Sequence, residues 1–80
     1  MMQKSPKSIA LKFDQLSPDG VRIEVDWGKF VVGTSIFIPA INLAKLDKEM
    51  QEVARLKQIQ LKGFDRIENG KLGMRFWRVL

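Results

Sequence analysis

The first half of the chain alternates between apolar and polar positions after a short polar start. Residues 1–8 are polar and basic, carrying Lys4 and Lys7, and we expect them to form a flexible arm. Apolar and small or polar residues then alternate over residues 9–13 and again over 21–27, a spacing typical of half-buried strands. Between them lies Ser-Pro-Asp-Gly, residues 17–20, which favours a tight turn. The two stretches therefore predict a β-hairpin.

The middle of the chain contains a continuous apolar run and then a helical pattern. Residues 34–38 are apolar or β-branched and end at Pro39, which predicts a central strand covered on both faces. Asn42 is a suitable N-cap, and apolar residues follow it at helical spacing. We expect a helix from residue 43 to about 60 that ends near Gly63, a residue suited to a left-handed cap.

The end of the chain carries the strongest local signal. Asn69-Gly70 separates residues 64–68 from residues 71–79, and both turn residues accept a positive φ, so a hairpin with a two-residue turn is predicted. The chain is thus expected to be one α+β domain over residues 9–80. Its antiparallel sheet has about five strands, with one helix packed on a face, in the order β-β-β-α-β-β.

A two-residue turn also determines which residues of the last hairpin face each other. Glu68 then faces Lys71, and Phe64 faces Arg75. Because side chains alternate across a sheet, one face is expected to hold core residues: Ile67, Leu72, Met74 and Phe76. The opposite face collects basic and aromatic residues: Lys62, Phe64, Arg66, Arg75 and Trp77.

Composition excludes several classes of function. In 80 residues there is no Cys and no His, which removes thiol chemistry and the commonest general base and metal ligand. Ser35 has no residue to activate it, and the carboxylates do not cluster. We therefore expect no enzyme activity, no metal and no cofactor. The sequence shows neither a signal peptide nor an apolar stretch long enough to span a membrane, so a cytoplasmic protein is expected.

The positive charge is concentrated at the end of the chain. The net charge is +5, with 14 Lys and Arg against 9 Asp and Glu, and most of the excess lies after residue 53. Basic side chains interleaved with aromatic ones suit nucleic acid, because rings stack on bases and cations contact phosphates. The leading hypothesis is a non-enzymatic protein that binds single- or double-stranded nucleic acid. Its candidate binding residues are Lys62, Phe64, Arg66, Arg75, Trp77 and Arg78.

Other interpretations use the same residues. Trp77 and Phe64 could instead pack in the core beneath the helix. Arg55, Lys57 and Lys62 could contact a duplex or complement the helix dipole. A small interaction module could bind an acidic surface of a host protein or pair as a homodimer, with Leu56 and Ile59 as an exposed apolar spot. An oligomeric structural subunit is a third alternative.

From Trp27 onward the chain resembles a group of small uncharacterised proteins of tailed bacteriophages and marine viral sequence. The resemblance rests on a Val-Gly-x-Ser-x-Phe-x-Pro segment, then a helix, then Gly-x-Arg-x-Trp-Arg near the end. These motifs correspond here to Val32, Gly33, Ser35, Phe37 and Pro39, and to Gly73, Arg75, Trp77 and Arg78. The resemblance covers about two-thirds of the chain and implies a phage accessory protein that acts in a host cytoplasm. It brings no established activity.

Overall fold

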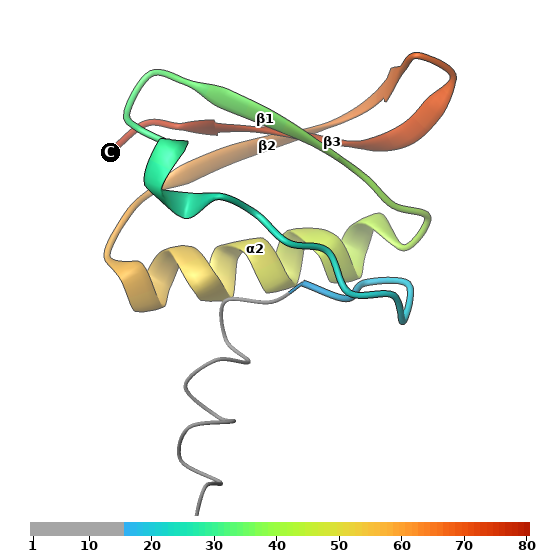
Figure 1. Ribbon diagram of the computed structural model, residues 1–80, viewed down its shortest axis with the longest axis horizontal. Coiled ribbons are helices and arrows are strands. Elements are labelled where there is room, and N and C mark those ends of the chain that lie inside the picture. The colour runs from blue at the N-terminus through green and yellow to red at the C-terminus, as the bar shows by residue number, and fades with distance from the viewer. Residues whose placement is uncertain (1–15) are drawn as a thin grey trace, which may run out of the picture.

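Residues 16–80 fold as one α-helix packed across one face of a three-stranded antiparallel sheet (Figure 1). The computed structural model describes residues 16–80. The elements follow in the order η1 (Trp27–Lys29, a 3-10 turn), β1 (Ser35–Pro39), α2 (Leu43–Lys57), β2 (Leu61–Glu68) and β3 (Lys71–Arg78). The strands lie side by side as β1-β3-β2, and the predicted α+β class is confirmed.

The last hairpin forms as its turn sequence predicts. Asn69 and Gly70 both have a positive φ, 52° and 75°, and Glu68 faces Lys71 across the turn. Phe64 accordingly faces Arg75, so the predicted register is confirmed. Because β1 also pairs with β3, β3 is the central strand, hydrogen-bonded to β2 on one side and to β1 on the other.

The core lies between α2 and the sheet. Leu46, Met50 and Val53 of the helix are buried against Met74 and Phe76 of the central strand. Of the four residues expected on this side of the hairpin, Ile67 and Leu72 are instead exposed, 72% and 41%. Figure 1 gives the reason, because the hairpin turn extends past the start of α2 and curls away from it.

Two predicted boundaries of the helix region are wrong. The helix ends at Lys57, and Gln58 takes the left-handed conformation at φ 60° that we assigned to Gly63. Gly63 lies inside β2 and faces Phe76, whose ring carbon Cε1 is 2.5 Å from where a Cβ on Gly63 would lie. Glycine is needed at this position because the Phe76 ring covers the backbone.

The five-stranded order is not confirmed. The expected strand over residues 9–13 lies outside the described residues. Residues 21–27 form no strand: Ile23 makes an isolated bridge to Leu16, and a 3-10 turn begins at Trp27. Their alternation predicts burial correctly from Ile23 onward, since Ile23, Val25 and Trp27 pack against the core, whereas Val21 is exposed. The turn at residues 17–20 is present, with the Gly20 N–H donating to the Ser17 carbonyl.

The apolar run that ends at Pro39 forms an edge strand, not a central one. Ile36 and Ile38 point toward the core, whereas Ser35 and Phe37 point to the uncovered side. An apolar residue on the uncovered side made this strand look covered on both faces. The outer side of β1 is flanked by residues 21–30, which run between sheet and helix in Figure 1.

Candidate nucleic-acid interface

The face of the sheet opposite α2 is uncovered by the rest of the described chain, and we call it the open face. Strand register places on it eleven side-chain positions from all three strands. They are Ser35, Phe37 and Pro39 of β1, Lys62, Phe64, Arg66 and Glu68 of β2, and Lys71, Gly73, Arg75 and Trp77 of β3. Five of the six predicted site residues therefore lie together.

Aromatic side chains are exposed on the open face. Phe64 is 54% exposed and Trp77 is 41% exposed. The alternative that both lie beneath the helix is wrong, because alternation along each strand turns them to the other side of the sheet. Phe37 is half-buried and adds a third ring, which sequence reasoning missed. Its ring lies over Gly73, where a Cβ would be 2.8 Å from Phe37 Cζ.

Arg75 stands at the centre of the open face, between Phe37 on β1 and Phe64 on β2. Its guanidinium carbon lies 5.9 Å from the centroid of the Phe37 ring. Its Nε and Nη2 each donate to Glu68 at 2.7 Å, and its Nη1 donates to Ser35 Oγ at 2.8 Å. Arg75 is therefore held by protein partners on both neighbouring strands.

Glu68 is the acidic group of this face. The hydrogen bonds from Arg75 hold the pKa of the Glu68 carboxyl below its ordinary value, and the nearby charges of Arg75 and Arg66 act in the same direction. Arg66 Nε lies 3.5 Å from the same carboxylate. The open face thus carries one carboxylate and four cations, so its net charge is positive. The cations are Lys62, Arg66, Lys71 and Arg75.

The least neutralised cations lie at the two ends of the face. Lys62 sits beside Trp77 in the β2–β3 register, and Lys71 follows the hairpin turn. Both are exposed, and neither has an ion-pair partner within residues 16–80. Arg66 is half exposed and shares Glu68 with Arg75. These three side chains can reach a polyanion without breaking the Arg75 contacts.

Arg78 does not belong to the open face. It follows Trp77, so it points to the helix side of the sheet. Its Nη1 donates to the Phe30 carbonyl at 3.0 Å and its Nε donates to the Leu80 carbonyl at 3.1 Å. Arg78 thereby joins the end of β3 to the segment after η1, and its position indicates a structural role.

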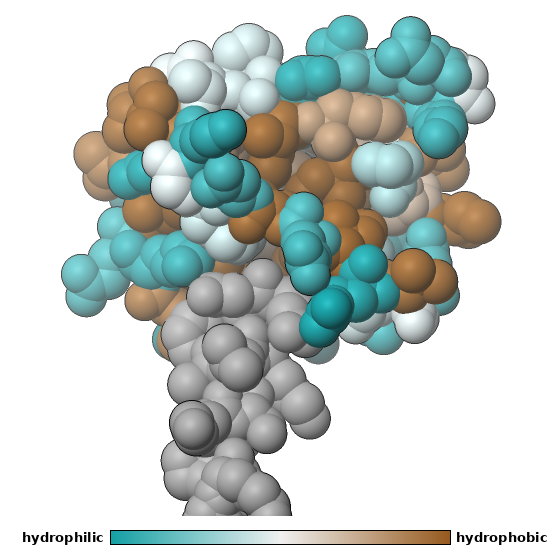
Figure 2. Space-filling model, in the orientation of Figure 1, coloured by the Kyte–Doolittle hydropathy of each residue, from teal (hydrophilic) through white to brown (hydrophobic). Residues whose placement is uncertain are grey.

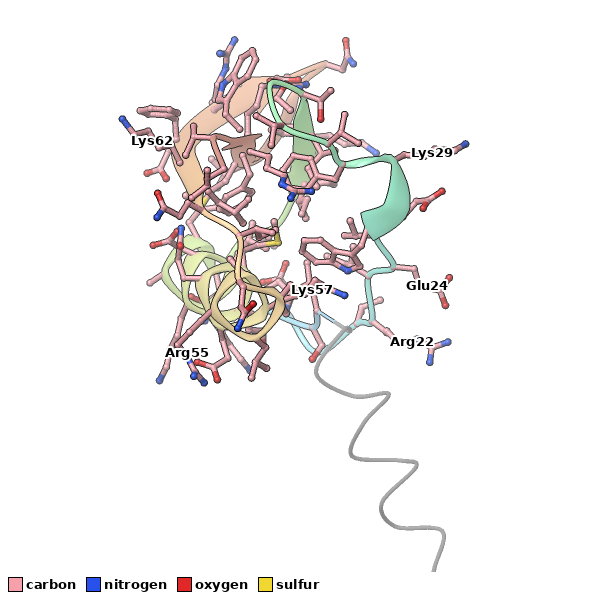
Figure 3. The ribbon with its side chains drawn as sticks, turned by 90° about the vertical axis from the view of Figure 1, so that its left-hand side faces the viewer. Arg22, Glu24, Lys29, Arg55, Lys57 and Lys62 are labelled. Carbon is pink, nitrogen blue, oxygen red and sulfur yellow. The ribbon has the colours of Figure 1, made fainter. Side chains whose placement is uncertain are left out.

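The cations near the end of the helix are not gathered into one site. In Figure 3, Lys62, Arg55 and Lys57 point in different directions. Arg55 is hydrogen-bonded to Glu52, and Lys57 lies over the Trp27 ring, 5.5 Å from its centroid. The apolar spot expected beside them is reduced to Leu56, since Ile59 packs against the core.

The described residues hold no group of three or more acidic side chains placed to bind a metal ion. The one helix found in residues 16–80 is too short and too polar to cross a bilayer. Searches against protein-family models, curated proteins and solved structures found no match for this chain.

Proposed function

We propose that the protein is a non-enzymatic nucleic-acid-binding accessory protein and that the open face is its binding surface. The observation that carries the proposal is the joint exposure of Phe64 and Trp77 beside the incompletely neutralised cations Lys62, Arg66 and Lys71. Large aromatic side chains on an uncovered sheet provide flat surfaces on which unpaired bases stack, each worth roughly 1–3 kcal/mol.

In this proposal the side chains of the open face have two different roles in binding. Trp77 and Phe64 stack on bases, and Lys62, Arg66 and Lys71 neutralise phosphates. Arg75 uses three donor nitrogens on Glu68 and Ser35. It therefore holds the strands of the open face together and attracts phosphates only through its charge, without direct contact. Because stacking requires unpaired bases, single strands are the favoured ligand over duplexes. The resemblance to phage proteins suggests that such binding takes place in a host cytoplasm.

The test is a titration of fluorescent single-stranded and duplex oligonucleotides at two salt concentrations. We expect single strands to bind more tightly and the affinity to fall steeply with salt, because neutralised phosphates release counterions. Absence of binding at micromolar protein and low salt would refute the proposal.

The competing function is an interaction module in which the same cations meet an acidic surface of a host protein. It differs in one readout: a partner captured from host lysate would persist after nuclease treatment. A structural subunit that assembles through its own copies would instead show a mass above the monomer by light scattering.

A further inference from the structure

The outer edge of β1 borders a groove of about 330 Å³. One wall is β1 itself, and the other is formed by residues 23–26 with Lys29 and Phe30. Figure 2 views this side of the molecule, where brown apolar side chains show between teal polar ones. The inner wall is apolar, contributed by Ile36 and Ile38, whose side chains point to the core side of β1.

The register of the sheet leaves backbone groups of β1 unpaired along this groove. The Ala40 N–H donates to Leu72, and Thr34 accepts from the Arg78 N–H, so even-numbered residues of β1 make its bonds to β3. In an antiparallel ladder the residues between them turn their N–H and C=O groups away from the neighbouring strand. Ser35 and Phe37 therefore direct both groups toward the free edge, and no acceptor for their N–H groups lies within residues 16–80.

We propose that this groove binds an extended peptide segment of a partner protein, which adds to β1 as a further strand. Peptide recognition by strand addition uses main-chain hydrogen bonds for affinity and pockets for alternate side chains for specificity. The outer wall of residues 23–26 and η1 stands beyond β1, as the side view in Figure 3 shows. This wall obstructs the approach of a whole second sheet to the edge of β1, which argues for a peptide over another copy of this protein.

The groove also specifies the chemistry of the peptide. Side chains on one side of the added strand lie beside the core-side row of β1, where Ile36 is partly exposed, so apolar residues suit alternate positions of the peptide. Glu24 and Asp26 line the outer wall with side chains 78% and 65% exposed, and each makes only an exposed, weak ion pair, with Arg22 at 3.3 Å and with Lys29 at 4.0 Å. Two carboxylates in a protein of net charge +5 favour a peptide that carries Lys or Arg, and they disfavour phosphate. The groove and the open face thus suit different ligands.

The experiment is a titration of the full-length ¹⁵N-labelled protein with the probe acetyl-Lys-Val-Thr-Val-Thr-Val-Lys-amide, followed by backbone amide shifts and hydrogen exchange. Without the probe, we expect the amides of Ile36 and Ile38 to exchange slowly and those of Ser35 and Phe37 to exchange fast. With the probe, exchange at Ser35 and Phe37 should slow. An absence of binding at millimolar probe, or binding that leaves these two amides unchanged, would overturn the proposal.

Two probe analogues test whether the contact is a strand pairing. One carries N-methyl groups on both Thr residues and the other on the three Val residues. In an antiparallel pairing the Thr N–H groups face β1, so the first analogue should bind at least about tenfold more weakly while the second retains affinity. In a parallel pairing the two roles are exchanged. Equal affinity of both analogues and the parent would show that no strand is added.

A pair of double variants tests the charge of the outer wall. Glu24→Gln with Asp26→Asn should weaken the lysine-containing probe several-fold, because it removes both carboxylates from the groove. Asp47→Asn with Glu52→Gln removes the same charge from α2 and should leave probe affinity unchanged. A loss of equal size in both double variants would mean that net charge alone, without the groove, attracts the peptide.

Discussion

Both carboxylate oxygens of Glu68 accept a hydrogen bond from the Arg75 guanidinium, each at 2.7 Å. Arg75 lies on the central strand, Glu68 near the end of β2, and the third guanidinium nitrogen reaches Ser35 on β1. One polar cluster therefore connects all three strands on the side of the sheet that α2 does not cover. Such bidentate pairs are shorter and more directional than neutral hydrogen bonds.

We expect the free energy of unfolding to fall as the pH drops below about 4.5. The pKa of Glu68 in the folded protein lies below its ordinary value of 4.5, chiefly because Arg75 donates to it. The unfolded chain then binds the proton more readily, so the stabilising contribution is complete above 4.5 and is lost as pH falls through the folded pKa. Asp19 contributes in the same direction, since the N–H groups of Ile41 and Asn42 lower its pKa. Urea unfolding measured between pH 7 and pH 2 checks this.

The substitution Glu68→Gln removes the contribution of one carboxylate to the pH dependence of stability. Its stability curve should be flatter in acid than that of the unsubstituted protein, while the Asp19 part remains. Glu52→Gln is the comparison variant: Arg55 also lowers the pKa of Glu52, but this pair is more exposed than Glu68 and Arg75, so the curve should flatten less. If Glu68→Gln had the same acid dependence as the unsubstituted protein, the Arg75 contact would not lower the pKa of Glu68.

The same Glu68→Gln substitution should affect binding in the opposite direction to stability. It removes the one carboxylate of the open face, so affinity for a single-stranded oligonucleotide at neutral pH should rise several-fold. The melting temperature of the protein should fall, because the contact with Arg75 is lost. Fluorescence anisotropy well below the melting temperature measures this. A drop in affinity in fully folded protein would mean that Arg75, held as it is, forms the essential contact.

Phosphate contacts should be visible in the salt dependence. Replacing Lys62, Arg66 and Lys71 together with Ala should reduce the slope of log affinity against log salt by about two, since each neutralised phosphate on a single strand contributes roughly 0.7. Arg22→Ala, Lys29→Ala and Lys45→Ala together form the control, with the same loss of charge away from the open face. Slopes reduced equally in both triple variants would indicate that binding depends on overall charge only.

Much of the second half of the fold follows from local signals. Asn69 and Gly70 both need a positive φ in a two-residue turn, so the turn fixed the pairing of Phe64 with Arg75 and thereby the composition of the open face. Asn42 caps the helix as its type suggests, accepting from the Lys45 N–H. In these cases one residue type and one short-range geometry decide the outcome.

Long-range relationships were not visible in the sequence. Phe37 joins the open face only because β1 pairs with β3, a strand about 40 positions later. Glu68 meets Arg75 because both lie on the same side of the hairpin, although they are not directly opposite each other. Arg78 stands next to Trp77 in sequence, yet the alternation of the strand separates them onto opposite faces. Asp19 lies in the turn at residues 17–20, yet its carboxylate accepts from the N–H groups of Ile41 and Asn42, just before the helix.

Gly63→Ala should destabilise the protein by about 1–3 kcal/mol, the usual cost of overpacking a core position. The added Cβ would lie 2.5 Å from Cε1 of the buried Phe76 ring and 3.1 Å from Met74 Cε. Chemical denaturation gives the free energy of unfolding. A second substitution, Phe76→Leu, should partly rescue Gly63→Ala, because it removes the ring that the new methyl group meets.

Trp77→Ala should separate binding from stability. Trp77 is 41% exposed on the open face, whereas Phe76, the preceding residue on the same strand, is fully buried. Phe76→Ala should therefore lower the free energy of unfolding by about 3–5 kcal/mol, the range for aromatic truncation in a core, and Trp77→Ala should lower it clearly less.

For affinity to the oligonucleotide we expect the opposite order. Trp77→Ala, and to a smaller degree Phe64→Ala, should weaken binding by about tenfold or more through lost stacking. Denaturant unfolding and anisotropy on the same preparations measure both quantities. If Trp77→Ala unfolded the protein as readily as Phe76→Ala while its folded fraction bound normally, Trp77 would be a packing residue and the stacking surface would have to be sought at Phe37 and Phe64.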